Sequence, residues 1–199
     1  MTEPFSVETV RQQLRHHHVE AVESNRRASV AMILRPIADE LHLLLIKRAE
    51  HPEDPWSGHM ALPGGRRDES DIDDLTTAYR ETLEEVGLNL AKDGEFLGAF
   101  DHLRASARGR PVDMVISPFV FYLKTLTLIV PSSEVVSTYW VAIRPLLDGR
   151  SNIEHVVKHP EGTFKVPAFG VEGNPVWGLT YRMIRNFFDL MSQSSSRIS

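Results

Sequence analysis

Three glutamates at helical spacing are the residues of this chain best suited to chemistry. Glu81, Glu84 and Glu85 stand three and four residues apart, so on a helix they lie on one arc and repel one another. We expect that helix over residues 73–86, ending at Gly87, and its dipole disfavours negative charge in the last turns. A divalent cation would remove the repulsion, and carboxylate oxygens are ligands that Mg²⁺ and Mn²⁺ prefer. The glutamates therefore predict a metal site, with a solvated acidic face as the alternative.

Residues around the glutamates extend this predicted site. A glycine pair, Gly64-Gly65, permits close backbone approach, so the backbone carbonyl of Gly65 is a candidate ligand. Arg80 stands four residues before Glu84 and can pair with it, which would orient that carboxylate. The neighbouring arc of the same helix is expected to face the core through Leu75, Ala78, Tyr79, Thr82, Leu83 and Val86.

Apolar runs and turn residues predict the elements that position the site. Ser6 caps an N-terminal helix that has Val7, Val10 and Leu14 on one face. A loop is expected over residues 50–65 and a closing helix over 176–191, and strands are expected over 29–34, 41–46, 95–100, 114–123 and 135–143. Because strands and helices are mixed rather than strictly alternating, the pattern indicates an α/β fold in which helices cover a mixed sheet.

Length, composition and charge exclude several classes of protein. The 199 residues suit one domain with a single core, and 42% hydrophobic with 25% charged residues is typical of folded chains. The absence of cysteine excludes disulfides, thiolate metal sites and cysteine nucleophiles. A net charge of −5 argues against binding to a nucleic acid polymer. The sequence has no apolar run long enough for a membrane helix and no signal-peptide pattern, so we expect a cytoplasmic protein without membrane association.

The glutamate-bearing segment resembles the motif of the Nudix hydrolase family. That motif runs from a glycine through five residues, a glutamate and seven residues to Arg-Glu-apolar-x-Glu-Glu-x-Gly-apolar. Gly65 matches its first glycine, and its end is matched by Arg80, Glu81, Glu84, Glu85, Gly87 and Leu88. The resemblance implies a Nudix-type α/β/α sandwich with a central mixed β-sheet.

Two departures from the motif lie in the same segment. Thr82 occupies a place that is apolar in the family. The place of the first glutamate holds Ile72, between Asp71 and Asp73. If Asp71 stands in for that glutamate, one extra residue lies in the loop before the arginine. In the family this glutamate is mainly structural, so the departure concerns the loop and not the chemistry.

The resemblance implies metal-dependent hydrolysis of a nucleoside diphosphate linked to another moiety. It makes Glu84 and Glu85 ligands of Mg²⁺ or Mn²⁺, together with the Gly65 carbonyl, and makes Glu81 a ligand or the base that activates water. Arg80 orients these groups, and Glu134, which opens a predicted strand, is a further candidate base from outside the helix. A non-catalytic Nudix module that binds a nucleotide is an alternative, but it predicts damaged carboxylates.

Within the family, the chain is most similar to the coenzyme A diphosphatase-like branch. The likeness extends over roughly residues 29–190 and is carried by Leu44–Arg48, Gly58–Gly65 and Thr77–Glu81. It implies cleavage of coenzyme A or a derivative to 3′,5′-ADP and 4′-phosphopantetheine. The branch signature is altered, because Glu53 stands where an arginine is expected and other substitutions are Ile46, His59 and Leu62. A sugar nucleotide, ADP-ribose or a dinucleotide is therefore an alternative substrate.

Four side chains are candidate contacts to the substrate. Arg104 and Arg108 fall in an arginine-rich segment that either grips a phosphate or forms an exposed hairpin tip. Trp56 either stacks on a base or pins its loop. Arg48, at the end of a branch-like segment, is the fourth candidate.

The resemblance also predicts how the chain is organised and what it binds. We expect an N-terminal helical segment over residues 1–27, a Nudix hydrolase domain over 28–191 and a flexible tail over 192–199. The expected partner is a small-molecule nucleotide diphosphate. Many Nudix enzymes are dimers, so a homodimer is compatible with the resemblance.

Overall fold

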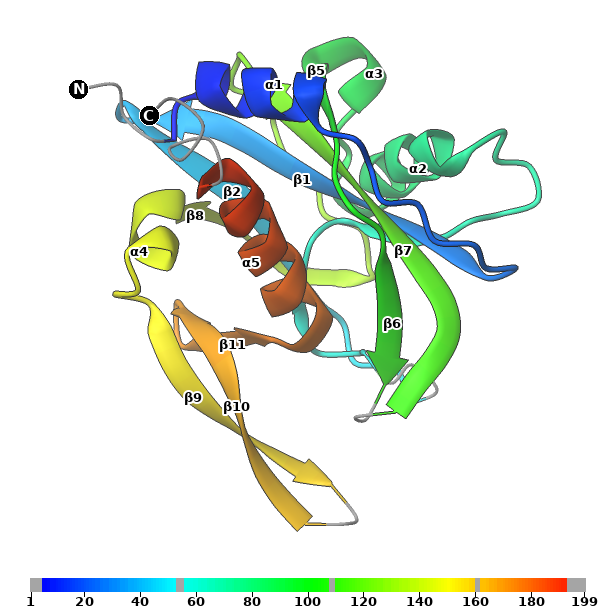
Figure 1. The fold of residues 1–199 in the computed structure, drawn as a ribbon, viewed down its shortest axis with the longest axis vertical. Coiled ribbons are helices and arrows are strands. Elements are labelled where there is room, and N and C mark those ends of the chain that lie inside the picture. Colours follow the sequence, from blue (N-terminus) through cyan, green and yellow to red (C-terminus); the bar gives the residue numbers. More distant parts are fainter. Residues whose placement is uncertain (1–4, 53–55, 108–109, 160–161, 193–199) are drawn as a thin grey trace.

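A mixed β-sheet forms the centre of the fold in the computed structural model, which describes residues 5–52, 56–107, 110–159 and 162–192 (Figure 1). Its path runs β3-β2-β1-β7-β5, with β4 paired to β1, β6 to β7 and β8 to β2. β1 and β7 are parallel, and the other pairs are antiparallel. The strands are β1 (Arg27–Ile37), β2 (Glu40–Arg48), β3 (Met60–Ala61), β4 (Gly64–Arg66), β5 (Gly94–Ala99), β6 (Leu103–Ala107), β7 (Arg110–Leu123) and β8 (Val135–Ala142).

Helices cover both faces of this sheet, which confirms the predicted α/β sandwich (Figure 1). Along β1, side chains alternate between two cores because successive residues of a strand point to opposite faces. Ala31 and Ile33 pack in the core beneath α2 (Asp74–Val86), whereas Met32 and Leu34 pack in the core beside α1 (Val7–His16) and α5 (Gly178–Ser192). Two short helices, α3 (Leu90–Asp93) and α4 (Ile143–Leu147), complete the layers.

Local sequence signals explain where α1 begins and where α2 begins and ends. The Ser6 hydroxyl accepts the Thr9 amide at 3.1 Å, so the predicted cap of α1 is confirmed. Asp73 caps α2 by accepting the Thr76 amide at 2.7 Å. Gly87 ends α2 with φ of 69°, in the left-handed region that favours glycine. No helix in the described part of the chain is long and apolar enough to cross a membrane.

A second sheet, absent from the sequence-based expectation, precedes the closing helix. It contains β9 (Asn152–His159), β10 (Gly162–Val171) and β11 (Asn174–Trp177) in the order β11-β10-β9. β9 and β10 form a ribbon that extends away from the main sheet (Figure 1). The helix predicted from residue 176 begins at Gly178 instead, because Val176 and Trp177 pair with β10.

Two further expectations about the site region are wrong. The predicted loop over residues 50–65 contains β3 and the start of β4. Leu83, expected in the core, has 49% of its surface exposed, whereas Glu85 is buried. The helix is therefore rotated so that the Glu85 side, not the Leu83 side, faces the sheet. The proposed boundaries of the N-terminal segment and the tail stay predictions, and residues 193–199 lie outside the described residues.

Candidate active site

Glu85 is a carboxylate that α2 places almost entirely inside the protein, with 3% of its surface exposed. Its Oε2 accepts the amide N–H of Gly64 at 2.8 Å, and its Oε1 lies 3.7 Å from Nη1 of Arg48. The pKa of Glu85 is raised to about 7, mainly by burial and also by the negative charges of Glu81 and Glu134, which together outweigh those two favourable contacts. The negative charge of Glu85 is therefore incompletely compensated by the surrounding protein.

Glu81 lies one turn earlier on α2 and packs directly against β4. A Cβ atom on Gly65 would lie 2.4 Å from Cδ of Glu81, so the absence of a side chain at Gly65 makes room for this carboxylate. Burial raises the pKa of Glu81, and the hydrogen bond from Arg80 lowers it only in part. The predicted proximity of Gly65 to the glutamates is confirmed, and Glu81 is a second carboxylate whose charge is poorly compensated.

Arg80 joins the carboxylates on this side of α2. Its Nη1 donates to Glu81 Oε1 and to Glu84 Oε2, both at 2.9 Å. Its Nη2 also donates to the backbone carbonyl of Arg66 at 3.0 Å, which ties the helix to the end of β4. The predicted pairing of Arg80 with Glu84 is confirmed, and the same guanidinium also orients Glu81.

Asp71 holds Arg80 in this position. Nε and Nη2 of Arg80 donate to its two oxygens at 3.0 and 2.9 Å, which is a bidentate arrangement. Asp71 also accepts the Thr77 hydroxyl and the Asp68 amide, each at 2.9 Å, and the bonds from Arg80 hold its pKa well below its usual range. Asp71 is buried, whereas 86% of the Ile72 surface is exposed. Asp71 thus forms the structural contact to Arg80 from the position that the sequence suggested.

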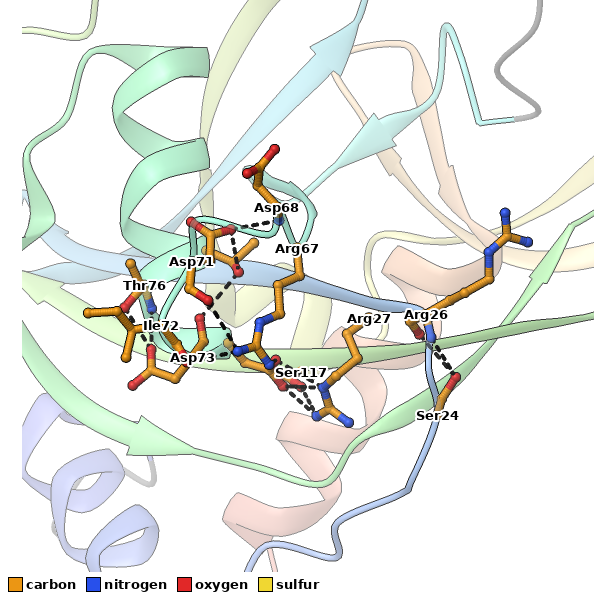
Figure 2. Close-up of polar contacts among 12 residues, drawn as sticks. Ser24, Arg26, Arg27, Arg67, Asp68, Asp71, Ile72, Asp73, Thr76 and Ser117 are labelled. Atoms are coloured by element: carbon orange, nitrogen blue, oxygen red, sulfur yellow. Dashed lines mark hydrogen bonds and ion pairs between the residues drawn. The ribbon is translucent and has the colours of Figure 1, made fainter.

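A polar network fixes the loop that carries Asp71 (Figure 2). Arg27 on β1 forms an ion pair with Asp74, the first residue of α2, and the Ser117 hydroxyl donates to Asp74 at 2.6 Å. Arg67 donates to the backbone carbonyls of Asp71 and Ile72 at 3.2 and 2.8 Å. The start of α2 is therefore bonded to β1 and β7, which sets the position of the residues that follow.

Glu134 brings a fourth carboxylate to the cluster from the segment before β8. Its backbone carbonyl accepts the amide of Ala49 at 2.8 Å, and its side chain is exposed. Its negative charge raises the pKa of both Glu81 and Glu85, so it acts on the same region as the helix glutamates. We name Glu81, Glu84, Glu85 and Glu134 the carboxylate cluster.

The donor chemistry of the carboxylate cluster fits a hard divalent cation. In the described part of the chain, no group of three His, Asp or Glu side chains is already arranged to hold a metal. Arg80 instead binds Glu81 and Glu84, while the Gly64 amide binds Glu85. The raised pKa of Glu81 and of Glu85 shows that their charged forms lack compensation, which a cation would supply. An all-oxygen set of this kind suits Mg²⁺ or Mn²⁺.

A pocket of about 550 Å³ lies beside β4. Gly65 faces Glu81, and its neighbour Arg66 lines the pocket, because side chains alternate along a strand. Arg26, from the segment before β1, and Trp56 also line the pocket. We name it the arginine pocket. β4 therefore carries residues of the carboxylate cluster region on one side and of the arginine pocket on the other.

The four predicted substrate contacts have different positions. Arg48 lies beside Glu85, at the carboxylate cluster. Trp56 lines the arginine pocket, and its indole N–H donates to the Ser106 carbonyl at 3.3 Å, so its loop is pinned to β6. Arg104 is exposed on β6 and is not among the pocket-lining residues, and Arg108 lies outside the described residues.

Sequence reasoning missed Arg26 and Arg66 as pocket residues. Each is the first member of an arginine pair, Arg26-Arg27 and Arg66-Arg67, and the second pair directly follows Gly65. The position of Arg66 next to the motif glycine was the signal that could have identified it as a site residue. The second member of each pair is bonded to Asp74, so only the structure separates the two kinds of arginine.

Comparison with known sequences gives the family. The NUDIX domain family matches residues 25–159. A protein named uncharacterized Nudix hydrolase NudL, from Yersinia pestis, is 31% identical over 185 residues, which covers 90% of this chain and 86% of that protein. Nudix hydrolase 3 of Caenorhabditis elegans is 28% identical over 187 residues, covering 85% and 75% respectively. An uncharacterized Schizosaccharomyces pombe protein is 41% identical over 141 residues, but the match spans only 43% of its length.

Solved structures share the fold at low sequence identity. The NUDIX domain of Shewanella oneidensis NrtR, complexed with ADP ribose, has a TM-score of 0.53 at 16% identity, covering 94% of this chain and 97% of that one. A MutT/nudix family protein from Enterococcus faecalis has a TM-score of 0.54 at 15% identity, covering 98% and 71%. The family match spans more than half of the sequence and includes the carboxylate cluster, and this chain therefore belongs to the Nudix hydrolase family.

Proposed function

We propose that the protein is a metal-dependent diphosphatase that hydrolyses a nucleoside diphosphate linked to another moiety. The observation that carries the proposal is that Arg80 binds Glu81 and Glu84, while Gly65 faces Glu81 and the Gly64 amide binds Glu85. These are the positions that the Nudix motif assigns to metal binding. The uncompensated charge of the two buried carboxylates supports the same assignment.

Glu84, Glu85 and the backbone carbonyl of Gly65 would hold Mg²⁺ or Mn²⁺, with Glu81 as a further ligand or as the base. When bound, the ion neutralises charge that develops on the diphosphate and makes a water molecule a stronger acid. The protein's own contribution is to keep these groups in place. Arg80 binds Glu81 and Glu84, and Asp71 binds Arg80 through two hydrogen bonds.

Proton transfer from the attacking water requires a base near the cluster. Glu81 is our first candidate, because Arg80 holds its carboxylate next to that of Glu84 and the motif gives it the role of ligand or base. Glu134 is the second candidate, because it is exposed and its charge acts on the same two buried carboxylates. Arg48, next to Glu85, is placed to meet a negatively charged substrate group at the edge of the cluster.

Coenzyme A or a derivative is the substrate that we propose within this class. The support is the sequence likeness of Leu44–Arg48, Gly58–Gly65 and Thr77–Glu81 to the coenzyme A diphosphatase-like branch. Sugar nucleotides, dinucleotides and ADP-ribose, which the NrtR domain binds, carry the same kind of diphosphate and are the other members of the test panel.

The test is incubation with Mg²⁺ or Mn²⁺ and each panel member, with products separated by chromatography. Formation of 3′,5′-ADP and 4′-phosphopantetheine would support coenzyme A, and cleavage of another member alone would replace it. Glu85→Gln should abolish the activity, whereas the exposed control Glu154→Gln should retain it. Equal activity of Glu85→Gln and the wild type, or no cleavage of any member, would contradict the proposed function.

A further inference from the structure

Two arginines of the arginine pocket have guanidinium groups with no bonding partner in the part of the chain that the structure describes. Arg26 and Arg66 both line the pocket, and among the described residues neither side chain forms an ion pair or hydrogen bond. Their neighbours Arg27 and Arg67 are bonded to Asp74 instead. Figure 2 shows Arg26 extending away from this bonded network. The two guanidinium groups are therefore available to a ligand.

The pairing of β1 with β4 puts these arginines on one face of the sheet. Ala28 is the register partner of Arg66, and Arg26 precedes Ala28 by two residues. Because side chains alternate in strands, Arg26 and Arg66 share the face of Ala28. Gly65 faces the other way, toward Glu81. Arg26 and Arg66 thus lie on the face of β4 opposite to Glu81, although Asp71, which binds Arg80, also lines the pocket.

The remaining wall of the pocket suits the ring of a nucleotide. Val112 and Met114 of β7 and the Trp56 ring line it. The hydrogen bond from the Trp56 indole to Ser106 fixes this ring, which lowers the cost of ordering it when a planar group stacks on it. Guanidinium groups next to an aromatic ring are the pattern that recognises a phosphate attached to a heterocycle.

We propose that Arg26 and Arg66 form a second anion site, which binds a phosphate group of the nucleotide outside the diphosphate that is cleaved. The proposal rests on the proposed function, because it assigns the pocket to the same substrate. Asp68 and Glu69 also line the pocket. Asp68 accepts the Ser70 amide and hydroxyl, both at 2.9 Å, whereas Glu69 has no bonding partner among the described residues. Glu69 therefore opposes the anion, and its neutralisation should strengthen binding.

The test compares two probes that differ by one phosphate, adenosine 3′,5′-bisphosphate and 5′-AMP. Their dissociation constants are measured by calorimetry in EDTA, with circular dichroism as the check on folding. The wild type should bind the bisphosphate roughly tenfold more tightly, as one charge-assisted contact to arginine allows. Arg26→Gln and Arg66→Gln should each reduce this preference, and Glu69→Gln should increase it. Arg15→Gln removes the same charge from an exposed helix position outside the pocket and should leave the preference unchanged.

Equal wild-type affinity for the two probes would overturn the proposal, as would a preference that survives in folded Arg26→Gln and Arg66→Gln variants. EDTA prevents metal-dependent turnover, so this result is independent of hydrolysis. A protein that shows the arginine-dependent preference but cleaves no panel member would contradict the proposed function and support the anion site. A protein that cleaves a panel member but shows no preference for the bisphosphate would support the proposed function and overturn the anion site.

Discussion

The carboxylate cluster and the arginine pocket lie on opposite sides of β4 and are held in opposite ways. Glu85 and Glu81 are largely buried, and Arg80 and the Gly64 amide already bond the cluster's helix glutamates. Arg26 and Arg66 are exposed and unbonded among the described residues. Buried charges need fixed partners, whereas exposed arginines are hydrated by solvent and remain accessible to a ligand. The comparison indicates that the cluster is preorganised for one reaction and that the pocket discriminates between substrates.

Neutralising Glu85 should have the largest effect on activity and should show most clearly that catalysis depends on the carboxylate cluster. Glu85→Gln should lower kcat by at least about 100-fold, because it removes a charged metal ligand. The free energy of unfolding in EDTA should stay the same or rise, because a poorly compensated buried charge is lost. Steady-state kinetics and urea denaturation measure both quantities. A large loss of stability in metal-free buffer would count against this assignment.

Adding one methyl group at Gly65 should damage the cluster and spare the arginine pocket. The new Cβ would lie 2.4 Å from Cδ of Glu81, so Gly65→Ala should displace that carboxylate and lower kcat by about tenfold or more. Gly170→Ala is the matched control, since its Cβ would make an ordinary 3.4 Å contact with Ile153. Kinetics of both variants test this, with the preference for adenosine 3′,5′-bisphosphate over 5′-AMP as the readout for the pocket. Equal kinetics of the two variants would remove Gly65 from the site.

Replacing Asp71 should lower both the activity and the stability of the protein, and the loss of stability should depend on pH. Asp71→Asn leaves Arg80 partly unpaired, which should cost about 2 kcal/mol of unfolding free energy at pH 7 and reduce kcat about 10-fold. The pKa of Asp71 is lower in the folded protein than in the unfolded chain. Its contribution is therefore fully present above about pH 4 and declines as the pH falls toward the folded-state value. Denaturation at several pH values should show the wild-type advantage shrinking below pH 4, and a constant difference would contradict the pairing.

Replacing Thr82 should have the smallest effect, and it tests the consequence of having threonine at a position that is apolar in the motif. Its side chain is fully buried beside the cluster, and its hydroxyl has no hydrogen-bond partner among the described residues. Thr82→Val replaces that hydroxyl by a methyl group of similar size and should raise the unfolding free energy by about 1 kcal/mol. Activity should not change, because the Thr82 hydroxyl forms no hydrogen bond to the carboxylate cluster. Thermal denaturation measures the gain, and a loss of stability would indicate a hydrogen bond that this account lacks.

The cluster was predictable from sequence to a greater extent than the pocket. Helical spacing and the Gly87 stop predict α2, so Glu81, Glu84 and Glu85 were found from local pattern alone. The burial of Glu85 and the exposure of Leu83 were not predicted, because the rotation of the helix depends on its packing against the sheet.

The arginine pocket draws on segments that are distant in the sequence. Arg26, Trp56, Arg66 and Met114 meet only because β4 and β7 both pair with β1. No local pattern distinguishes Arg26 from the bonded Arg27. The ribbon of β9 and β10 was missed for a related reason, since much of it is exposed and lacks a long apolar run. Long-range pairing therefore sets the limit of the sequence-based prediction.

We propose that the carboxylate cluster binds the divalent cation. The most direct test is titration with Mn²⁺ followed by electron paramagnetic resonance, for the wild type, Glu84→Gln, Glu85→Gln and the control Glu154→Gln. We expect the wild type and the control to bind Mn²⁺ alike and the two cluster variants to bind it at least about tenfold more weakly. Unchanged Mn²⁺ affinity in both folded cluster variants would contradict the claim.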